Sequence, residues 1–130
     1  MNHKKYYIEL GKLFYAIANA DGKIEPKEIA ALREIIQNQF VTVEAESDEF
    51  GVNDAYYAEF EFETLNEKSA NVELAFNSFI NFVKLNRNEI DKEMKQSCIM
   101  AATAIADSFH KKNQSEVHYI SRLKHELHKI

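Results

Sequence analysis

The stretch "AIANADGKIEPKEIAALREI", residues 16–35, has the pattern of a helix end, a turn and the start of a second helix. Asp21-Gly22 is a typical turn pair, and Pro26 stands where a first helical residue needs no amide hydrogen. Apolar residues recur every three or four positions on both sides of the turn, which is the spacing of one helical face. The stretch therefore predicts a helical corner. The expected helices cover residues 6–19 and 26–40.

Four further segments are predicted to be helical from the same spacing of apolar residues. The segment 57–65, "YAEFEFETL", also alternates in a way that fits a strand, but a lone strand would have no partner, so a short helix is expected. Asn88 is a good helix cap and is expected to start the fifth helix. The other expected helices cover residues 69–85, 88–109 and 114–127.

The composition agrees with an all-α fold. The 130 residues are 45% apolar and include 9 Phe and 6 Tyr, but only 3 Gly and 1 Pro, which leaves few turns for a β fold. This length suits one domain with a core of its own. We therefore expect a single domain over residues 1–130, built from six to seven helices.

The two ends of the chain resemble each other. Shifting the sequence by 88 residues places residues 16–35 over residues 104–123, with five identities and apolar positions in the same helical phase. Matched phase favours a duplication over chance similarity. The pattern predicts two helix-turn-helix hairpins related by a pseudo-twofold axis.

The aligned turns separate structural from functional residues. With Glu25 as N-cap, Glu28 takes the third helical position, where a carboxylate faces the positive end of the helix. Asn113 and Glu116 take the same two positions in the second copy. Asp21 has no such structural role, because its counterpart in the second copy is not acidic. It is therefore the residue most open to a function.

Two patterns bear on a metal site at the protein's ends. Residues 17–28 match an EF-hand loop at several positions, but Ile17 stands where the first acidic ligand is expected. His125 and His128, three residues apart on the last expected helix, are alternative zinc ligands. A plain helical corner and solvated terminal histidines are the competing interpretations.

"IANADGKIEPKEIAALREII", residues 17–36, resembles the first motif of the TerB-like tellurite-resistance family. The resemblance implies an all-helical domain of about seven helices with an internal duplication and an acidic cluster that binds a divalent metal. By position, Asp21 and Glu28 match the first motif and Glu116 the second, where Phe109-His110 replaces the second Asp-Gly. It also implies a cytoplasmic module of membrane-associated stress complexes, and hence a protein partner.

Charge and motif content narrow the classes of function. Residues 44–67 contain nine acidic residues and no Lys or Arg, which repels phosphate backbones and argues against nucleic acid as a partner. The same segment could dock a basic protein through Tyr56, Tyr57, Phe60 and Phe62. The lone Cys98 is consistent with a reducing compartment, and no phosphate loop or nucleophile elbow is present. No export signal and no membrane-spanning run of apolar residues is visible either.

We therefore expect a non-catalytic cytoplasmic module with a stress-response or scaffolding role, which binds a divalent cation weakly. Ca²⁺, Mg²⁺ and Zn²⁺ all remain open as the ion, and no other cofactor is expected. The alternative is a protein-interaction domain that uses segment 44–67 without metal. The expected metal-binding residues are Asp21, Glu25, Glu28 and Glu116.

Overall fold

The computed structural model describes residues 1–20, 24–41, 52–108 and 114–130, and for residues 114–117 it describes the backbone alone. These ranges contain six α-helices and no β-strand, which confirms the predicted all-α fold. The helices are α1 (His3–Ala18), α2 (Pro26–Ile36), α3 (Tyr56–Lys68), α4 (Val72–Leu85), α5 (Lys92–Ser108) and α6 (Gln114–Lys129). A π-helical turn, η1 (Gln37–Val41), continues α2.

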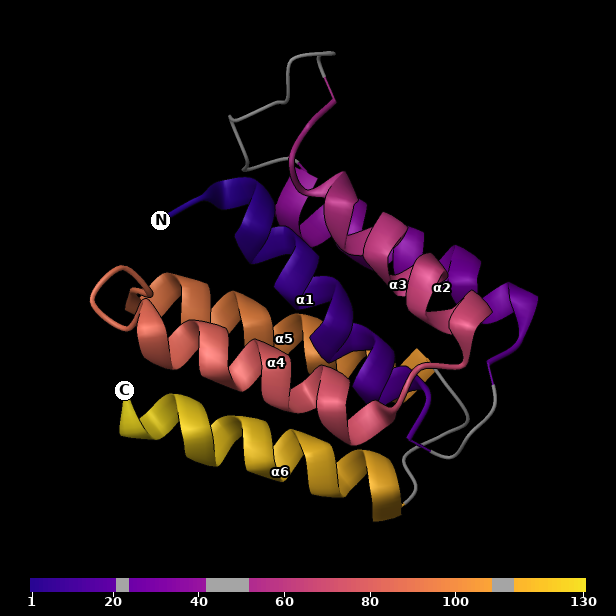
Figure 1. Cartoon of the computed structure of the whole chain (residues 1–130). Helices are drawn as coiled ribbons and strands as arrows, with labels where there is room; N and C mark the ends of the chain where they lie inside the picture. The colour runs from indigo at the N-terminus through magenta and orange to yellow at the C-terminus, as the bar shows by residue number, and fades with distance from the viewer. Residues whose placement is uncertain (21–23, 42–51, 109–113) are drawn as a thin grey trace.

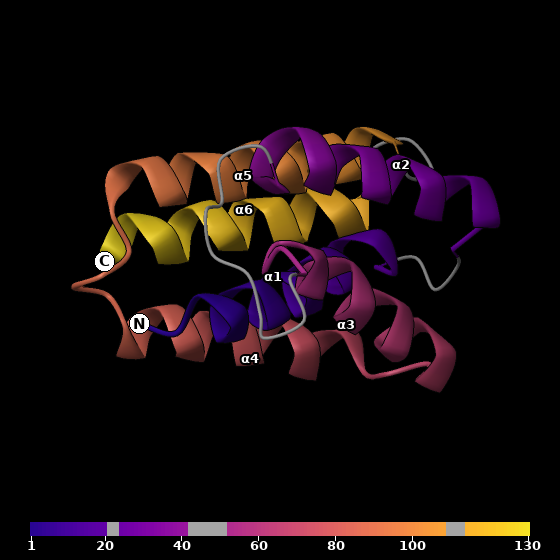
Figure 2. The ribbon, with the colours of Figure 1, turned by 90° about the horizontal axis from the view of Figure 1, so that it is seen from above.

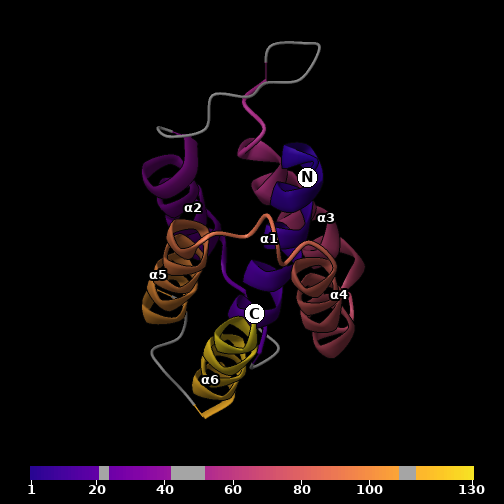
Figure 3. The same cartoon turned by 90° about the vertical axis from the view of Figure 1, so that its left-hand side faces the viewer.

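Helix α1 lies at the centre of the bundle (Figure 1). Figure 2 shows α3 and α4 on one side of α1, with α2, α5 and α6 on the other. Seen along the helices in Figure 3, α1 is enclosed by its neighbours, and it contacts α3, α4, α5 and α6. A helix with partners on several sides must be apolar around most of its circumference.

The sequence of α1 meets that requirement. Its buried side chains occupy all sides of the helix from Tyr6 onward, and Leu10, Phe14 and Ile17 are fully buried. Small residues let neighbouring helices approach closely, and Ala16 of α1 and Ala102 of α5 are both fully buried. Helix α1 also lies close to α3 at Gly11, where a side chain would meet the α3 backbone at Ala58.

The starts of α1, α2 and α4 each have a local cause. Asn2 caps α1 by accepting a hydrogen bond from the Lys5 backbone nitrogen at 2.9 Å. Glu25 is the N-cap of α2 and Pro26 its first residue, as predicted. Asn71 caps α4 through the backbone nitrogen of Leu74, also at 2.9 Å. These side-chain acceptors satisfy amides that have no partner within the helix.

The predicted start of the fifth helix at Asn88 is wrong. Helix α5 begins at Lys92, and the carboxylate of Asp91 accepts a hydrogen bond from the Met94 backbone nitrogen at 2.8 Å. Ile90 is buried immediately before this cap. Burying Ile90 fixes the chain there in a non-helical link, so the next Asx residue, Asp91, becomes the cap.

The segment 57–65 is helical, which confirms the prediction of a helix over a strand. The Phe62 side chain of α3 is fully buried and its ring lies 6.1 Å from that of Tyr15, whereas Phe60 is 46% exposed. Helix α3 ends at Lys68, and its C-cap is Ser69, whose φ of 51° is left-handed. The Ala70 amide donates back to the Leu65 carbonyl. A left-handed residue at this position is a common helix ending.

The predicted pair of hairpins is only partly visible in the packing. Helices α5 and α6 contact each other, whereas α2 packs against α5 and α3. Both connecting turns, residues 21–23 and 109–113, lie outside the described residues. The internal duplication therefore stays a prediction. Within the described part of the chain, every helix is too short or too polar to cross a membrane.

Candidate functional site

The corner between α1 and α2 contains two of the four predicted metal-binding residues in described positions. Glu25 and Glu28 are both at the start of α2. Asp21 lies outside the described residues, and Glu116 belongs to the first turn of α6, where the side chains are not described. The structure therefore brings Glu25 and Glu28 together and leaves the roles of Asp21 and Glu116 as predictions.

Glu28 is a buried capping residue. It is 3% exposed, and its Oε1 accepts a hydrogen bond from the backbone nitrogen of Glu25 at 2.6 Å. This is the N3 half of a capping box, and it places a carboxylate against the positive end of the α2 dipole. The predicted structural role of Glu28 is thus confirmed.

Glu25 has a different environment. Its side chain is 40% exposed and lies near Lys27, with 3.5 Å between Glu25 Oε2 and Lys27 Nζ. An exposed ion pair of this kind contributes little to stability, so the carboxylate is accessible to another cation. At this corner, Glu25 is the described carboxylate that solvent ions reach most easily.

The preceding helix end is held by side-chain hydrogen bonds. The Asn19 amide nitrogen donates to the Tyr15 hydroxyl at 2.9 Å, and that hydroxyl donates to the Ala70 carbonyl at 2.7 Å. The chain links the end of α1 to the connection between α3 and α4. It holds the end of α1 against that connection.

Histidine and acidic side chains elsewhere do not gather into a metal site in the described part of the chain. No group of three or more His, Cys, Asp or Glu in those ranges could hold a metal ion. His125 and His128 are both exposed on α6. The side chains of Asp21 and Glu116 are not described, so this statement does not include them.

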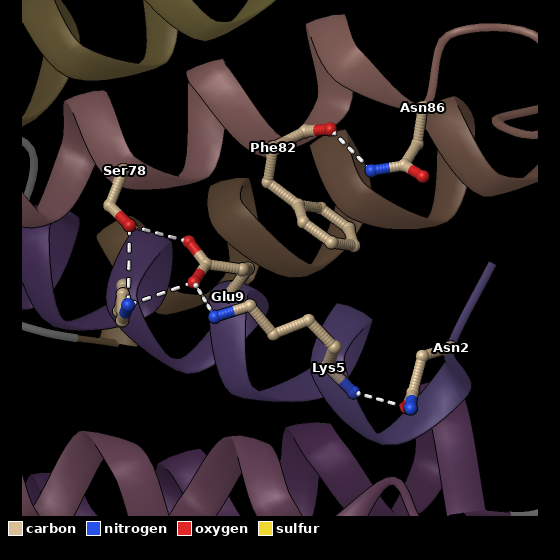
Figure 4. A network of polar contacts seen from close by, with 7 residues as sticks. Asn2, Lys5, Glu9, Ser78, Phe82 and Asn86 are labelled. Carbon is tan, nitrogen blue, oxygen red and sulfur yellow. Dashed lines mark hydrogen bonds and ion pairs between the residues drawn. The ribbon is translucent and has the colours of Figure 1, made fainter.

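A buried carboxylate between α1 and α4 was not anticipated from the sequence. Glu9 of α1 is only 2% exposed. Figure 4 shows its carboxylate pointing toward Ser78 of α4. Its Oε1 accepts a hydrogen bond from the Ser78 hydroxyl at 2.7 Å, and its Oε2 lies 2.8 Å from Lys12 Nζ and 3.1 Å from Lys5 Nζ. Lys12 also donates to Ser78 at 3.2 Å, which closes the network.

These contacts keep Glu9 charged. Burial raises its pKa, but hydrogen bonds from Lys12, Ser78 and Lys5 outweigh burial, so the pKa lies below its usual range. The sequence did carry a signal for this network. Glu9 falls on the apolar face of its helix, with one lysine four residues before it and another three residues after it.

A second network joins α4 to α6. Arg122 Nη1 lies 2.7 Å from Glu73 Oε2, and the same oxygen accepts a hydrogen bond from the Tyr119 hydroxyl at 2.7 Å. The guanidinium also lies over the Phe76 ring, 4.5 Å from its centroid. The hydrogen bonds from Arg122 and Tyr119 lower the pKa of Glu73 to about 2. Both networks tie α4 to its neighbours.

Cys98 is unsuited to nucleophilic chemistry. The thiol is buried in the core, and burial raises its pKa well above the usual range. The thiolate is the reactive form of cysteine, so a thiol held protonated is inert. Its role is packing.

The structure is thus a small all-helical domain built around α1. Its described carboxylates cap helices, as Glu28 does, or form ion pairs between helices, as Glu9 and Glu73 do. A family model described as tellurite resistance protein TerB matches residues 8–128. The chain therefore belongs to the TerB family, and the predicted resemblance is confirmed. No curated protein and no solved structure matches it.

Proposed function

We propose that this TerB-family domain is a non-catalytic module of a cytoplasmic stress response, which acts as a scaffold and binds a divalent cation weakly at the α1–α2 corner. The observation that carries the proposal is the family match over residues 8–128, nearly the whole chain. The family's description concerns tellurite resistance, which is a response to a toxic compound. A protein partner, in a membrane-associated complex, belongs to the same proposal.

The cation would be held by Asp21 and Glu25, supported by Glu28 and Glu116. Glu25 offers an exposed carboxylate, while Glu28 already accepts a hydrogen bond from the Glu25 backbone. Hard divalent cations prefer several oxygen ligands, and a site with few free carboxylates binds them weakly. Because the Glu28 carboxylate is engaged as a cap, we propose weak rather than tight binding.

The test is a thermal unfolding series with CaCl₂, MgCl₂ or ZnCl₂. A cation that binds the folded chain alone raises Tm in proportion to the logarithm of its concentration once the site saturates. Asp21→Ala should abolish that rise and leave the fold intact by circular dichroism. Glu34→Gln, which removes an exposed charge from α2 two turns away, is the matched control and should keep the rise.

Two results would remove the cation from the proposal. One is the absence of a metal-dependent rise in Tm at about millimolar ion, the range of weak extracellular calcium modules. The other is an equal rise in wild type and Asp21→Ala. Neither result would touch the family membership.

The alternative proposal is a metal-free interaction domain that uses the acidic aromatic segment 44–67. Phe60 is 46% exposed on α3, with its ring 5.6 Å from that of Tyr57, and this exposure favours docking. Phe62 cannot take part, since it is buried, and Glu59 is already paired with Arg33. Residues 44–51 lie outside the described part of the chain.

An oligolysine peptide tests this surface by nuclear magnetic resonance. We expect shifts in the α3 amides that weaken with added salt, because exposed charges are screened. Phe60→Ala together with Glu67→Lys should reduce the shifts, whereas Glu34→Gln should not. Peptide binding that survives high salt and the double substitution would place the interface elsewhere.

A further inference from the structure

The two most exposed large apolar side chains in the described part of the chain lie on one face of α4. Leu74 is 70% exposed and Leu85 is 85% exposed. They are 11 residues apart, which is about three helical turns, so both lie on the same side of the helix. In Figure 3, α4 lies at the edge of the bundle, with α1 on its inner side and no described helix beyond it. This outward face is therefore accessible to another molecule.

The spacing along this face is typical of a surface that pairs with another helix. Leu74, Ser78, Asn81 and Leu85 follow one another at intervals of four, three and four residues. Coiled-coil helices place their contact residues at the same alternating intervals. We call these four residues the α4 seam. None of them is charged, and the opposite side of the helix is buried in the core, so the seam faces outward.

The seam fits a second copy of the same chain, because its intervals read the same in both directions. Two α4 helices that run antiparallel about a twofold axis would pack Leu74 of each chain on Leu85 of the other. Ser78 of each chain would then face Asn81 of the other between the two leucine contacts. A twofold interface uses the same patch on both chains, so it requires a pattern of this kind. A polar residue such as Asn within the seam fixes the register of the paired helices.

Charges at the two ends of α4 favour the antiparallel direction. The first turn carries Glu73, whereas Lys84 and Arg87 lie in the last turn and just after it. Antiparallel helices place the acidic end of each beside the basic end of the other, and parallel helices place like charges together. Glu73 and Lys84 also have ion-pair partners in their own chain, so these charges set the direction more than the affinity. A second copy thus offers both the leucines and the opposite charges that complement this face.

We propose that two copies of this chain associate through the α4 seam as an antiparallel dimer with twofold symmetry. One helix from each chain makes a small interface, and small interfaces are typical of weak and transient complexes. The dimer therefore forms in a concentration-dependent way. This inference does not rest on the proposed cation at the α1–α2 corner or on segment 44–67.

The first test is sedimentation velocity of the full chain over a series of concentrations. We expect the weight-average mass to rise from that of one chain toward that of two. Leu85→Lys should raise the dissociation constant at least about tenfold, because each leucine occurs twice in the dimer. Its side chain lies outside the core, so the fold should persist by circular dichroism. Met100→Lys replaces an apolar residue of α5 that is 58% exposed, and this matched control should leave the association unchanged.

The second test determines the direction of the paired helices. Chains that carry Leu74→Cys are mixed with chains that carry Leu85→Cys and are then oxidised mildly, while the native Cys98 is buried. A disulfide needs its two residues to be close neighbours, and the antiparallel pair brings residue 74 of one chain next to residue 85 of the other. The mixture should therefore form covalent dimers, and each variant alone should form far fewer.

Three results would overturn the proposal. The first is a wild-type chain that stays monomeric up to about millimolar concentration, which is already a very weak affinity. The second is an association that Leu85→Lys leaves unchanged. The third is cross-linking of Leu74→Cys alone that matches the mixture, since this would mean parallel or random contact.

Discussion

The carboxylates of this domain differ in their contacts, and these contacts decide what each of them does. Glu9 and Glu28 are buried and hydrogen-bonded, Glu25 is half exposed, and Glu73 is clamped by Arg122. An ionised carboxylate is retained inside a protein only where donors replace its water. The acidic composition therefore serves structure first, and only the more exposed carboxylates are available to ligands.

The ion pair between Glu73 and Arg122 makes the stability of the domain sensitive to acid. Its pKa is lowered from 4.5 to about 2 in the folded chain, chiefly by the hydrogen bond from Arg122. A carboxylate with a lowered folded-state pKa contributes its full stability above the unfolded pKa and loses it as pH falls toward the folded pKa. The contribution should therefore be complete above about pH 5 and shrink between pH 4.5 and pH 2.

Urea unfolding of wild type and Glu73→Gln at several pH values measures this contribution. The carboxylate is 48% exposed, so solvent screening limits the effect to no more than about 1 kcal/mol at neutral pH. The difference between the two proteins should narrow steadily below pH 4.5. Glu34→Gln changes an exposed carboxylate, and its difference from wild type in the free energy of unfolding should not narrow in this way. A difference that is constant with pH would contradict the assignment.

At the scale of the elements, the contact between α1 and α3 depends on a single missing side chain. A Cβ atom at Gly11 would lie 2.5 Å from the Ala58 carbonyl oxygen and 2.9 Å from Glu61 Cβ. Both neighbours belong to α3, and the nearer atom is backbone, so relief requires the two helices to separate. The glycine is thus a packing residue in the middle of the central helix.

Gly11→Ala should destabilise the domain by about 1–3 kcal/mol, the usual cost of overpacking. The gain in helix propensity, about 1 kcal/mol, opposes this cost without cancelling it. Urea unfolding gives the comparison, with Ser121→Ala on the exposed side of α6 as a control expected to be near neutral. A Gly11→Ala variant as stable as wild type would show that α1 and α3 are not in close contact.

Short sequence motifs predicted where helices lie better than they predicted which helices pack together. The start of α2 followed from Glu25, Pro26 and Glu28, because a capping box is encoded within four residues. The start of α5 could not be predicted in this way, because Asn88 and Asp91 are both good caps. Which of them caps the helix depends on the burial of Ile90, and burial is set by residues far away in the sequence.

At the scale of the whole molecule, the sequence predicted an all-α TerB domain, and the structure and the family match confirm it. The site was less accessible to sequence reasoning. The Glu9 network joins residues 9 and 78, and the Glu73 network joins residues 73 and 122. Contacts over such separations arise from packing, which no local pattern encodes.

The proposed cation at the α1–α2 corner is the functional claim on which the account most depends. Its most direct test is anomalous diffraction from crystals of the protein soaked in MnCl₂ or ZnCl₂. The account predicts a peak beside Asp21 and the exposed carboxylate of Glu25, lost in Asp21→Ala. No peak at this corner, while the soaked ion is ordered elsewhere on the molecule, would contradict it.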